Sequence, residues 1–224
     1  MEMEIVVPDE VPMMTLPGLA FFPQALLPLH IFEPRYRTML RDVLATNRLF
    51  AVAGINPRKP DDFEPPHRIA TMGIVRACQE NKDGTSNLLL QGLARVEIQG
   101  IVRDEPYRTV RIRALASQPG ADEEENGKLR ARLSRLLVTR QRLSGEASNE
   151  LTRFLKSVND PEIFVDLAVF SFCDKPRLKQ KLLETLDVHE RMELFSADVR
   201  ADIEAIKLRH KLQGGLSEDG IAGN

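Results

Sequence analysis

The chain has 224 residues, enough to bury a core in one domain of two lobes or in two small domains. Its formal net charge is −2, and it has no tryptophan and only two tyrosines, so neither a general basic field nor a row of base-stacking side chains indicates nucleic acid. No apolar run approaches the roughly 20 residues that span a bilayer. Cys78 and Cys173 are far apart, without ligand-like neighbours. We therefore expect a cytoplasmic protein with free thiols and no membrane partner.

Residues 15–27, TLPGLAFFPQALL, are unusually apolar for a stretch with two prolines and a glycine. The prolines disfavour a central strand, and an irregular apolar segment cannot cover itself, so part of it is expected to line a groove. The candidates for contacting a peptide are Phe21, Phe22, Leu26 and Leu27. The alternative is that these side chains belong to the core, and for Phe22 and Leu27 that alternative is at least as well supported.

Residues 27–44 begin as an extended apolar stretch and continue with helical spacing. Pro34 fixes φ at about −65° and has no N–H, which suits the first position of a helix that includes Tyr36. Glu33 lies where a carboxylate meets the positive end of this helix, whereas Arg35 on the first turn opposes the helix dipole. We expect Glu33 and Arg35 to form an ion pair that fixes a strand-to-helix joint, not a catalytic pair.

Short apolar runs bounded by turn residues predict β-strands over the first half of the chain, the clearest at 49–53, 74–79, 87–102 and 110–113. Asp83-Gly84 predicts a hairpin between the second and third of these strands, because glycine adopts positive φ without steric cost. Gly92 interrupts the third strand and predicts a bulge or a sharp coil there.

Residues 56–66 form a long loop rich in proline and charge. A loop of this length in a compact lobe is either mobile or used in binding. Phe63 is its single aromatic residue, and we expect it to add a wall to the groove predicted above.

Residues 117–126, SQPGADEEEN, combine proline, glycine and four acids, which predicts a boundary. Beyond it, helices are expected over 128–143, from Asp160-Pro161 onward, and from Asp187 with Glu190 at capping-box spacing. The expected organisation is a β-rich lobe at 1–118, an acidic linker at 119–127, a helical bundle at 128–212 and a disordered tail at 213–224.

The helix expected at 128–143 carries six cations and no acid: Lys128, Arg130, Arg132, Arg135, Arg140 and Arg142. One interpretation is a basic face for an acidic partner or RNA. The other, which we favour because charge runs are usually solvated faces, is a surface balanced by the acids at 122–125.

Four stretches of this sequence together resemble the LON substrate-binding domain, the N-terminal domain of Lon-type ATP-dependent proteases. The most specific is LPLHIFEPRYRTML at 27–40. Ile69-Ala70-Thr71, the hairpin and strand at 83–96, and segments between 160 and 192 agree with that family in order and spacing. The resemblance covers residues 13–212.

This resemblance implies an α+β fold in which a PUA-like pseudo-barrel with one inserted helix is followed by an α-helical bundle. Ala70 stands where the family has glycine, which relaxes the need for a close backbone approach there. Arg95, three residues after Gly92, is expected to be a buried, hydrogen-bonded strut between a strand and a helix, in preference to a ligand contact.

The motifs of the family's catalytic parts are not found in these 224 residues. The nearest approach to a P-loop, residues 120–128, has the wrong spacing and four acids that would repel a phosphate. Residues 82–86 echo a serine motif, but in a hairpin, where a lysine stays protonated. The histidines are isolated, and none lies at metal-ligand spacing: His30, His67, His189 and His210. We expect no catalytic residue, no cofactor and no metal.

The leading hypothesis is a non-enzymatic module that binds unfolded or apolar polypeptide segments and serves as an adaptor in protein quality control, with a separate protease or chaperone. Exposed apolar side chains are the common property of such segments. The alternatives are a PUA-like RNA-binding module that uses the basic helix, and a small-molecule-binding protein.

Overall fold

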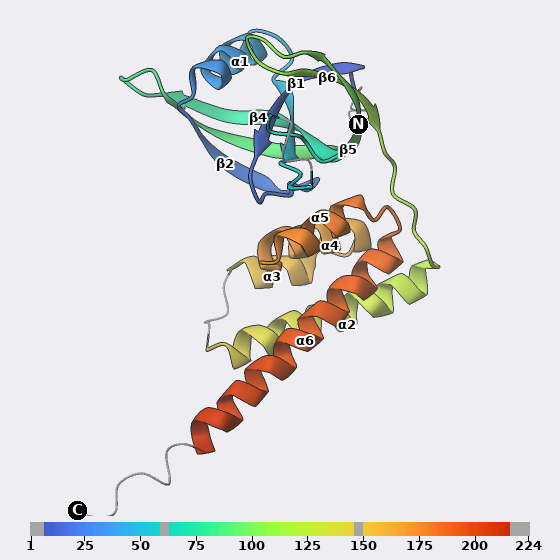
Figure 1. The fold of residues 1–224 in the computed structure, drawn as a ribbon. Helices are drawn as coiled ribbons and strands as arrows, with labels where there is room; N and C mark the ends of the chain where they lie inside the picture. Colours follow the sequence, from blue (N-terminus) through green and yellow to red (C-terminus); the bar gives the residue numbers. More distant parts are fainter. Residues whose placement is uncertain (1–6, 59–62, 146–149, 216–224) are drawn as a thin grey trace, which may run out of the picture. The chain divides into compact units, whose positions relative to one another are not determined.

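The computed structural model describes residues 7–58, 63–145 and 150–215 (Figure 1). Its elements follow in this order: β1 (Glu10–Leu16), β2 (Leu26–Ile31), α1 (Pro34–Leu44), β3 (Leu49–Gly54), β4 (Ile69–Glu80), β5 (Ser86–Arg103), β6 (Thr109–Ala114), α2 (Glu123–Leu143), α3 (Glu150–Ser157), α4 (Pro161–Phe172), α5 (Pro176–Glu184) and α6 (Val188–Gly215). This mixture of strands followed by helices confirms the predicted α+β class.

By their mutual contacts, the residues fall into two compact units. Unit 1 comprises residues 1–118 together with 166–186, and unit 2 comprises 119–165 together with 187–224. The chain therefore enters unit 1 twice, and helix α4 begins in unit 2 and ends in unit 1.

Five strands of unit 1 close into a barrel. The strand order is β2-β5-β4-β3-β1-β6, and β6 pairs again with β5 (Figure 1). Closure depends on the 18-residue length of β5, whose first part pairs with β2 and whose last part pairs with β6. β1 and β3 run parallel, whereas the other neighbours are antiparallel.

The barrel interior is filled by residues two positions apart on successive strands, because side chains in a strand alternate between its faces. They are Val11, Met13, Leu49, Ala51, Ala53, Ala70, Met72, Val96, Ile98, Val110 and Ile112. Burial of each large aliphatic side chain of this set contributes about 1.5–3 kcal/mol.

The bulge predicted at Gly92 is present in the pairing of β4 with β5. Met72 pairs with Ala94 and Gly73 pairs with Gly92, so one residue of β5, Leu93, is left over. The Gly92 N–H donates to the Ala25 carbonyl at 2.9 Å, and the incoming segment crosses the strand there. A Cβ atom at Gly92 would lie 2.1 Å from the Phe22 carbonyl oxygen, which explains why the position lacks a side chain.

Helix α1 begins at Pro34, as predicted, directly after β2. It buries Tyr36, Met39, Leu40 and Val43, and it lies beside β1. The predicted hairpin is also present, with Gly84 at φ 77° between β4 and β5.

In unit 2, helix α2 begins at Glu123, five residues earlier than expected. Asp122 caps it, its Oδ1 accepting the Glu125 N–H at 2.8 Å. The run of acids on the first turn is stabilised by the positive end of the helix, so the part of the predicted linker from 123 to 127 is helical.

Asp160 and Asp187 cap the starts of α4 and α6, with side-chain oxygens accepting backbone N–H groups three residues on, at 2.8 Å in both cases. Helix α6 packs against α2 and continues to Gly215. Residues 213–215 of the predicted tail belong to α6, and its residues from 216 onward lie outside the described part of the chain. None of the described helices combines the length and apolar character needed to cross a membrane.

Candidate functional site

The strand-to-helix joint of unit 1 is fixed by a network centred on Arg35. The Arg35 Nε donates to Glu33 Oε2 at 2.9 Å, which is the pair expected from the sequence, and Nη2 donates to Glu64 Oε1 at 2.8 Å. The Thr15 hydroxyl donates to the other Glu64 oxygen at 2.8 Å. These bonds tie α1, β1 and the loop that precedes β4 to one another.

The charges of this network are held in place by their partners. The hydrogen bond from Arg35 lowers the pKa of the Glu64 carboxyl below its ordinary value, and the same bond raises the pKa of Arg35. Glu64 has a φ of 42°, in the left-handed region that few non-glycine residues adopt. Such strain persists only where surrounding contacts hold the residue, as Arg35 and Thr15 do here.

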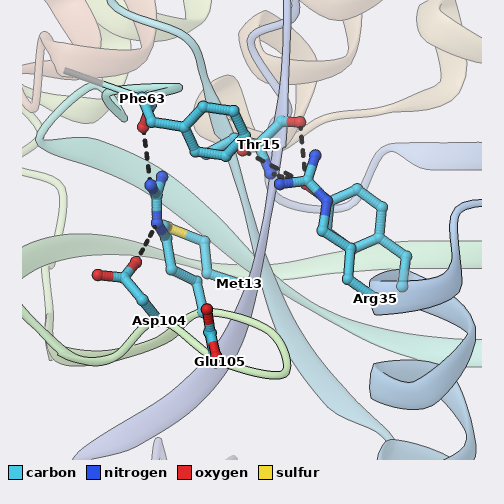
Figure 2. Close-up of a pocket in the computed structure, with 8 residues that line it drawn as sticks. Met13, Thr15, Arg35, Phe63, Asp104 and Glu105 are labelled. Atoms are coloured by element: carbon cyan, nitrogen blue, oxygen red, sulfur yellow. Dashed lines mark hydrogen bonds and ion pairs between the residues drawn. The ribbon is translucent and has the colours of Figure 1, made fainter.

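Phe63 is 71% exposed, yet two cations hold its ring (Figure 2). The Arg35 Cζ lies 5.6 Å from the ring centroid and the Arg108 Cζ lies 5.8 Å from it. Arg108 also donates to the backbone carbonyls of Phe63 and Glu64, at 2.7 Å in both cases, and to Asp104 at 2.8 Å. Cation–π contacts at exposed sites contribute about 0.5–1 kcal/mol each. The ring is therefore positioned without being covered.

Phe63 bounds two clefts of unit 1. One has a volume of about 240 Å³ and is lined by Met13, Thr15, Arg35, Tyr36, Phe63, Asp104, Glu105 and Arg108 (Figure 2). The other has a volume of about 620 Å³ and is lined by Phe63, Pro65, Pro66, His67, Arg68, Ile98, Gln99, Gly100, Ile101, Asp104 and Arg108. We call this pair the Phe63 clefts.

The other predicted peptide-contacting residues lie elsewhere. Phe21 and Phe22 are buried at 1% and 0% exposure, and Leu27 at 8%. The Phe21 ring packs edge-on against Phe170 at 6.0 Å. Leu26 is 52% exposed, but it lines neither of the Phe63 clefts. Of the five predicted peptide-contacting residues, Phe63 is the one that lines the Phe63 clefts.

Arg95 is buried in unit 1 and hydrogen-bonded, as the sequence suggested. Its Nη1 and Nη2 donate to the two carboxylate oxygens of Asp166 at 2.8 and 2.6 Å, and its Nε donates to the Leu183 carbonyl at 3.2 Å. The side chains of Arg95 and Asp166 are each 1% exposed. This pair joins the barrel strand β5 to the helices of the same unit and is closed to ligands.

Among the described residues, no group of three or more His, Cys, Asp and Glu side chains is placed to hold a metal ion. The Nδ1 atoms of His30 and His189 are hydrogen-bonded to the Oδ1 atoms of Asn87 and Asn126, at 2.8 and 2.9 Å. The Nδ1 atom of His67 lies 3.7 Å from Glu184 Oε1. Burial lowers the pKa of His67, which borders the larger cleft.

The sequence did not predict a role for five of the cleft residues or for Glu64 of the Arg35 network. The five cleft residues are Met13, Thr15, Asp104, Glu105 and Arg108. The charged, proline-containing run at 104–108 between two predicted strands was a loop signal that could have drawn attention to Asp104 and Arg108. Nothing local to Thr15 or Met13 distinguishes them from other strand residues.

The sequence and the fold of this chain are similar to those of known proteins. A family model described as the ATP-dependent protease La (LON) substrate-binding domain matches residues 10–196. The Lon protease of Desulfosudis oleivorans is 26% identical over 220 residues, covering 95% of this chain and 26% of that protein. The Lon protease of Syntrophus aciditrophicus is 26% identical over 219 residues, covering 95% and 28%. The chain thus spans about a quarter of the length of these curated relatives.

Two solved structures share the fold. The N-terminal domain of Mycobacterium avium complex Lon protease superposes with a TM-score of 0.67 at 18% identity, covering 86% of this chain and 98% of that chain. The Lon N-terminal domain protein from Xanthomonas campestris superposes with a TM-score of 0.61 at 22% identity, covering 84% and 97%.

Proposed function

This chain belongs to the LON substrate-binding domain family, and from that membership we propose that unit 1 binds unfolded or apolar polypeptide segments at the Phe63 clefts. The observation that carries the proposal is a phenylalanine that is 71% exposed, held by two guanidinium groups and shared by the linings of two clefts. A fixed aromatic ring offers a large apolar contact at little cost in conformational entropy.

The smaller of the two clefts suits a side chain better than a compact ligand. Its volume of about 240 Å³ is below the size that usually encloses a small-molecule ligand, but it can receive single side chains. Side chains two residues apart in an extended segment point to the same side. A segment crossing Phe63 can therefore place apolar groups in both clefts, while Arg35, Asp104 and Arg108 offer hydrogen bonds to its backbone.

We further propose that this site binds without catalysing a reaction. Arg35 keeps the pKa of Glu64 low, so this carboxylate stays ionised and cannot supply a proton near neutral pH. Asp104 is held by Arg108 at 2.8 Å. Such a binding surface supports an adaptor role, in which the protein presents the bound segment to a separate protease or chaperone.

The test is binding of a labelled, uncharged apolar peptide, followed by fluorescence anisotropy. Phe63→Ala is expected to weaken binding by about 5- to 30-fold, the loss of 1–2 kcal/mol typical of an aromatic anchor. The melting temperature should fall by no more than a few degrees, because the exposed ring contributes only two weak cation–π contacts and its backbone carbonyl still accepts from Arg108.

Phe154→Ala is the matched control, since Phe154 is 54% exposed and lies on α3 in unit 2. It should bind the peptide like the unsubstituted protein. Equal weakening in the two variants, or no saturable binding below about 1 mM, would contradict the proposal.

A further inference from the structure

Unit 2 carries a cleft of its own, between α2 and α3, with a volume of about 510 Å³. Three cations line it, Arg130 and Arg135 from α2 and Lys156 from α3. Its other lining residues are small, apolar or hydroxyl-bearing, and no carboxylate is among them. The chain as a whole has a net charge of −2, so this cleft is a local concentration of positive charge on a slightly acidic protein.

The acids that begin α2 do not neutralise this cleft. Glu124 forms its ion pair with Lys128, and Asp122 caps the helix. Farther along the helix, Arg140 pairs with Asp202 of α6 at 3.6 Å. Within the described part of the chain, Arg135 and Lys156 form no ion pair, so the interpretation of a face balanced by its neighbouring acids does not extend to the cleft.

Arg130 is held in position by neutral partners. Its Nη1 donates to the Val158 carbonyl at 2.9 Å, and its Cζ lies 5.5 Å from the centroid of the Phe164 ring. Neither partner cancels its charge. The guanidinium is therefore ordered and still cationic, which reduces the entropy that a bound carboxylate would cost it.

Apolar side chains line the cleft beside its cations. Ala131 and Val138 lie on the same face of α2 as Arg135, because residues three, four and seven apart project to one side of a helix. A lining that combines apolar groups with cations complements a helix that carries apolar residues on one face and acids beside them. Extended nucleic acid is favoured less, because no aromatic side chain lines the cleft for base stacking.

We propose that this cleft, the basic groove of α2 and α3, docks an acidic amphipathic helix of a partner protein. Carboxylates of the partner would pair with Arg130, Arg135 and Lys156, and its apolar face would cover Val138. The site lies in unit 2 and is separate from the Phe63 clefts, so it extends the proposed function to a second partner of different chemistry.

The experiment uses the full chain and a fluorescein-labelled synthetic helix with leucines on one face and glutamates on the other. Saturable binding is expected, weakening as salt is added because the attraction is between charges. Arg135→Glu combined with Lys156→Glu should weaken binding by about tenfold or more, and Val138→Ser should weaken it by a smaller factor. A helix with lysine in place of glutamate should not bind.

The matched control is Arg209→Glu combined with Lys211→Glu, which makes the same charge change at exposed positions of α6 outside the groove. It should keep binding within about twofold. Circular dichroism checks that each variant is folded, and Arg135→Gln with Lys156→Gln replaces the reversal variant if that variant unfolds.

Three outcomes would overturn the proposal. One is equal weakening by the groove and control variants, which would indicate general attraction to the protein surface. Another is tighter, groove-dependent binding of a single-stranded RNA oligonucleotide, which would assign the groove to nucleic acid. The last is an absence of saturable binding by the unsubstituted protein.

Discussion

Arg95 and Asp166 place two opposite charges in the interior of unit 1, where each side chain is 1% exposed. Removing two charges from water is costly, and their attraction compensates only when the geometry is good and the remaining polar groups are bonded. Both conditions are met, because Arg95 donates one hydrogen bond to each carboxylate oxygen of Asp166 and a further one to the Leu183 carbonyl. The stability of unit 1 therefore depends on a contact between two residues that are 71 positions apart in the sequence.

Arg95→Met is expected to lower the free energy of unfolding by about 3–5 kcal/mol, because it removes the guanidinium that donates two hydrogen bonds to the buried Asp166 carboxylate. Urea unfolding followed by circular dichroism measures the change. Combining it with Asp166→Leu should recover a large part of that loss, since two apolar residues leave no uncompensated charge. A double variant as unstable as the sum of the two single variants would show that the ions act independently.

Phe63 and Phe21 illustrate how the same residue type takes opposite roles. The Phe21 ring is 1% exposed and packs on Phe170, whereas Phe63 is 71% exposed and lies between Arg35 and Arg108. Both were peptide-contact candidates, because composition alone does not reveal which apolar groups another element covers. A peptide-binding role for either residue stays a prediction.

Strand β5 contains one glycine whose position leaves no room for a side chain and another whose position does. A Cβ at Gly92 would lie 2.1 Å from the Phe22 carbonyl oxygen, whereas a Cβ at Gly100 would meet nothing within 4 Å. The backbone of the incoming segment cannot give way easily at Gly92, because it is hydrogen-bonded to the strand at that point. The bulge and the crossing segment therefore require each other.

Gly92→Ala is expected to destabilise the protein by about 1–3 kcal/mol, the usual cost of inserting a carbon atom into a packed site. Gly100→Ala on the same strand is the control and should change stability by no more than about 0.5 kcal/mol. Urea unfolding compares the two. A Gly92→Ala variant as stable as the Gly100→Ala variant would mean that the crossing segment can shift freely.

Local signals predicted many of the elements. Pro34 sets the start of α1, Gly84 sets the hairpin, and Asp160 and Asp187 cap their helices through bonds to residues three positions away. Helix α2 begins five residues before its predicted start, because acids such as those at 122–125 are also typical of a linker. Their fit to a helix N-terminus, with Asp122 as the cap, is equally local and could have been recognised.

The two units do not correspond to the first and second halves of the sequence. Residues 166–186, on α4 and α5, belong with the barrel, and Gln180 of α5 donates to the Ile69 carbonyl of β4 at 3.1 Å. Arg95 of the barrel finds its carboxylate on α4. A barrel cut off at residue 118 would therefore lose the Asp166 carboxylate that binds the buried Arg95 guanidinium.

A fragment of residues 1–118 is accordingly expected not to unfold cooperatively, and to lack the near-UV circular dichroism of the full chain. Adding a synthetic peptide of residues 159–187 should restore a cooperative transition, because it supplies Asp166 and the Leu183 carbonyl. If the fragment alone gave a sharp urea transition, the lobe predicted at 1–118 would be an independent domain.

Features encoded within a few residues could be inferred from the sequence: the strand-to-helix joint at Pro34, the hairpin, the bulge at Gly92 and the LON family pattern. Such features depend on backbone preferences and on hydrogen bonds between residues close in sequence, and both can be inferred from a short stretch of sequence. The pairing of Arg95 with Asp166, the attachment of Glu64 to Arg35, and the separation of buried Phe21 from exposed Phe63 required the folded chain. The two ion pairs join residues that are 71 and 29 positions apart in the sequence. Which side chains become buried likewise depends on the surfaces that the completed fold brings together.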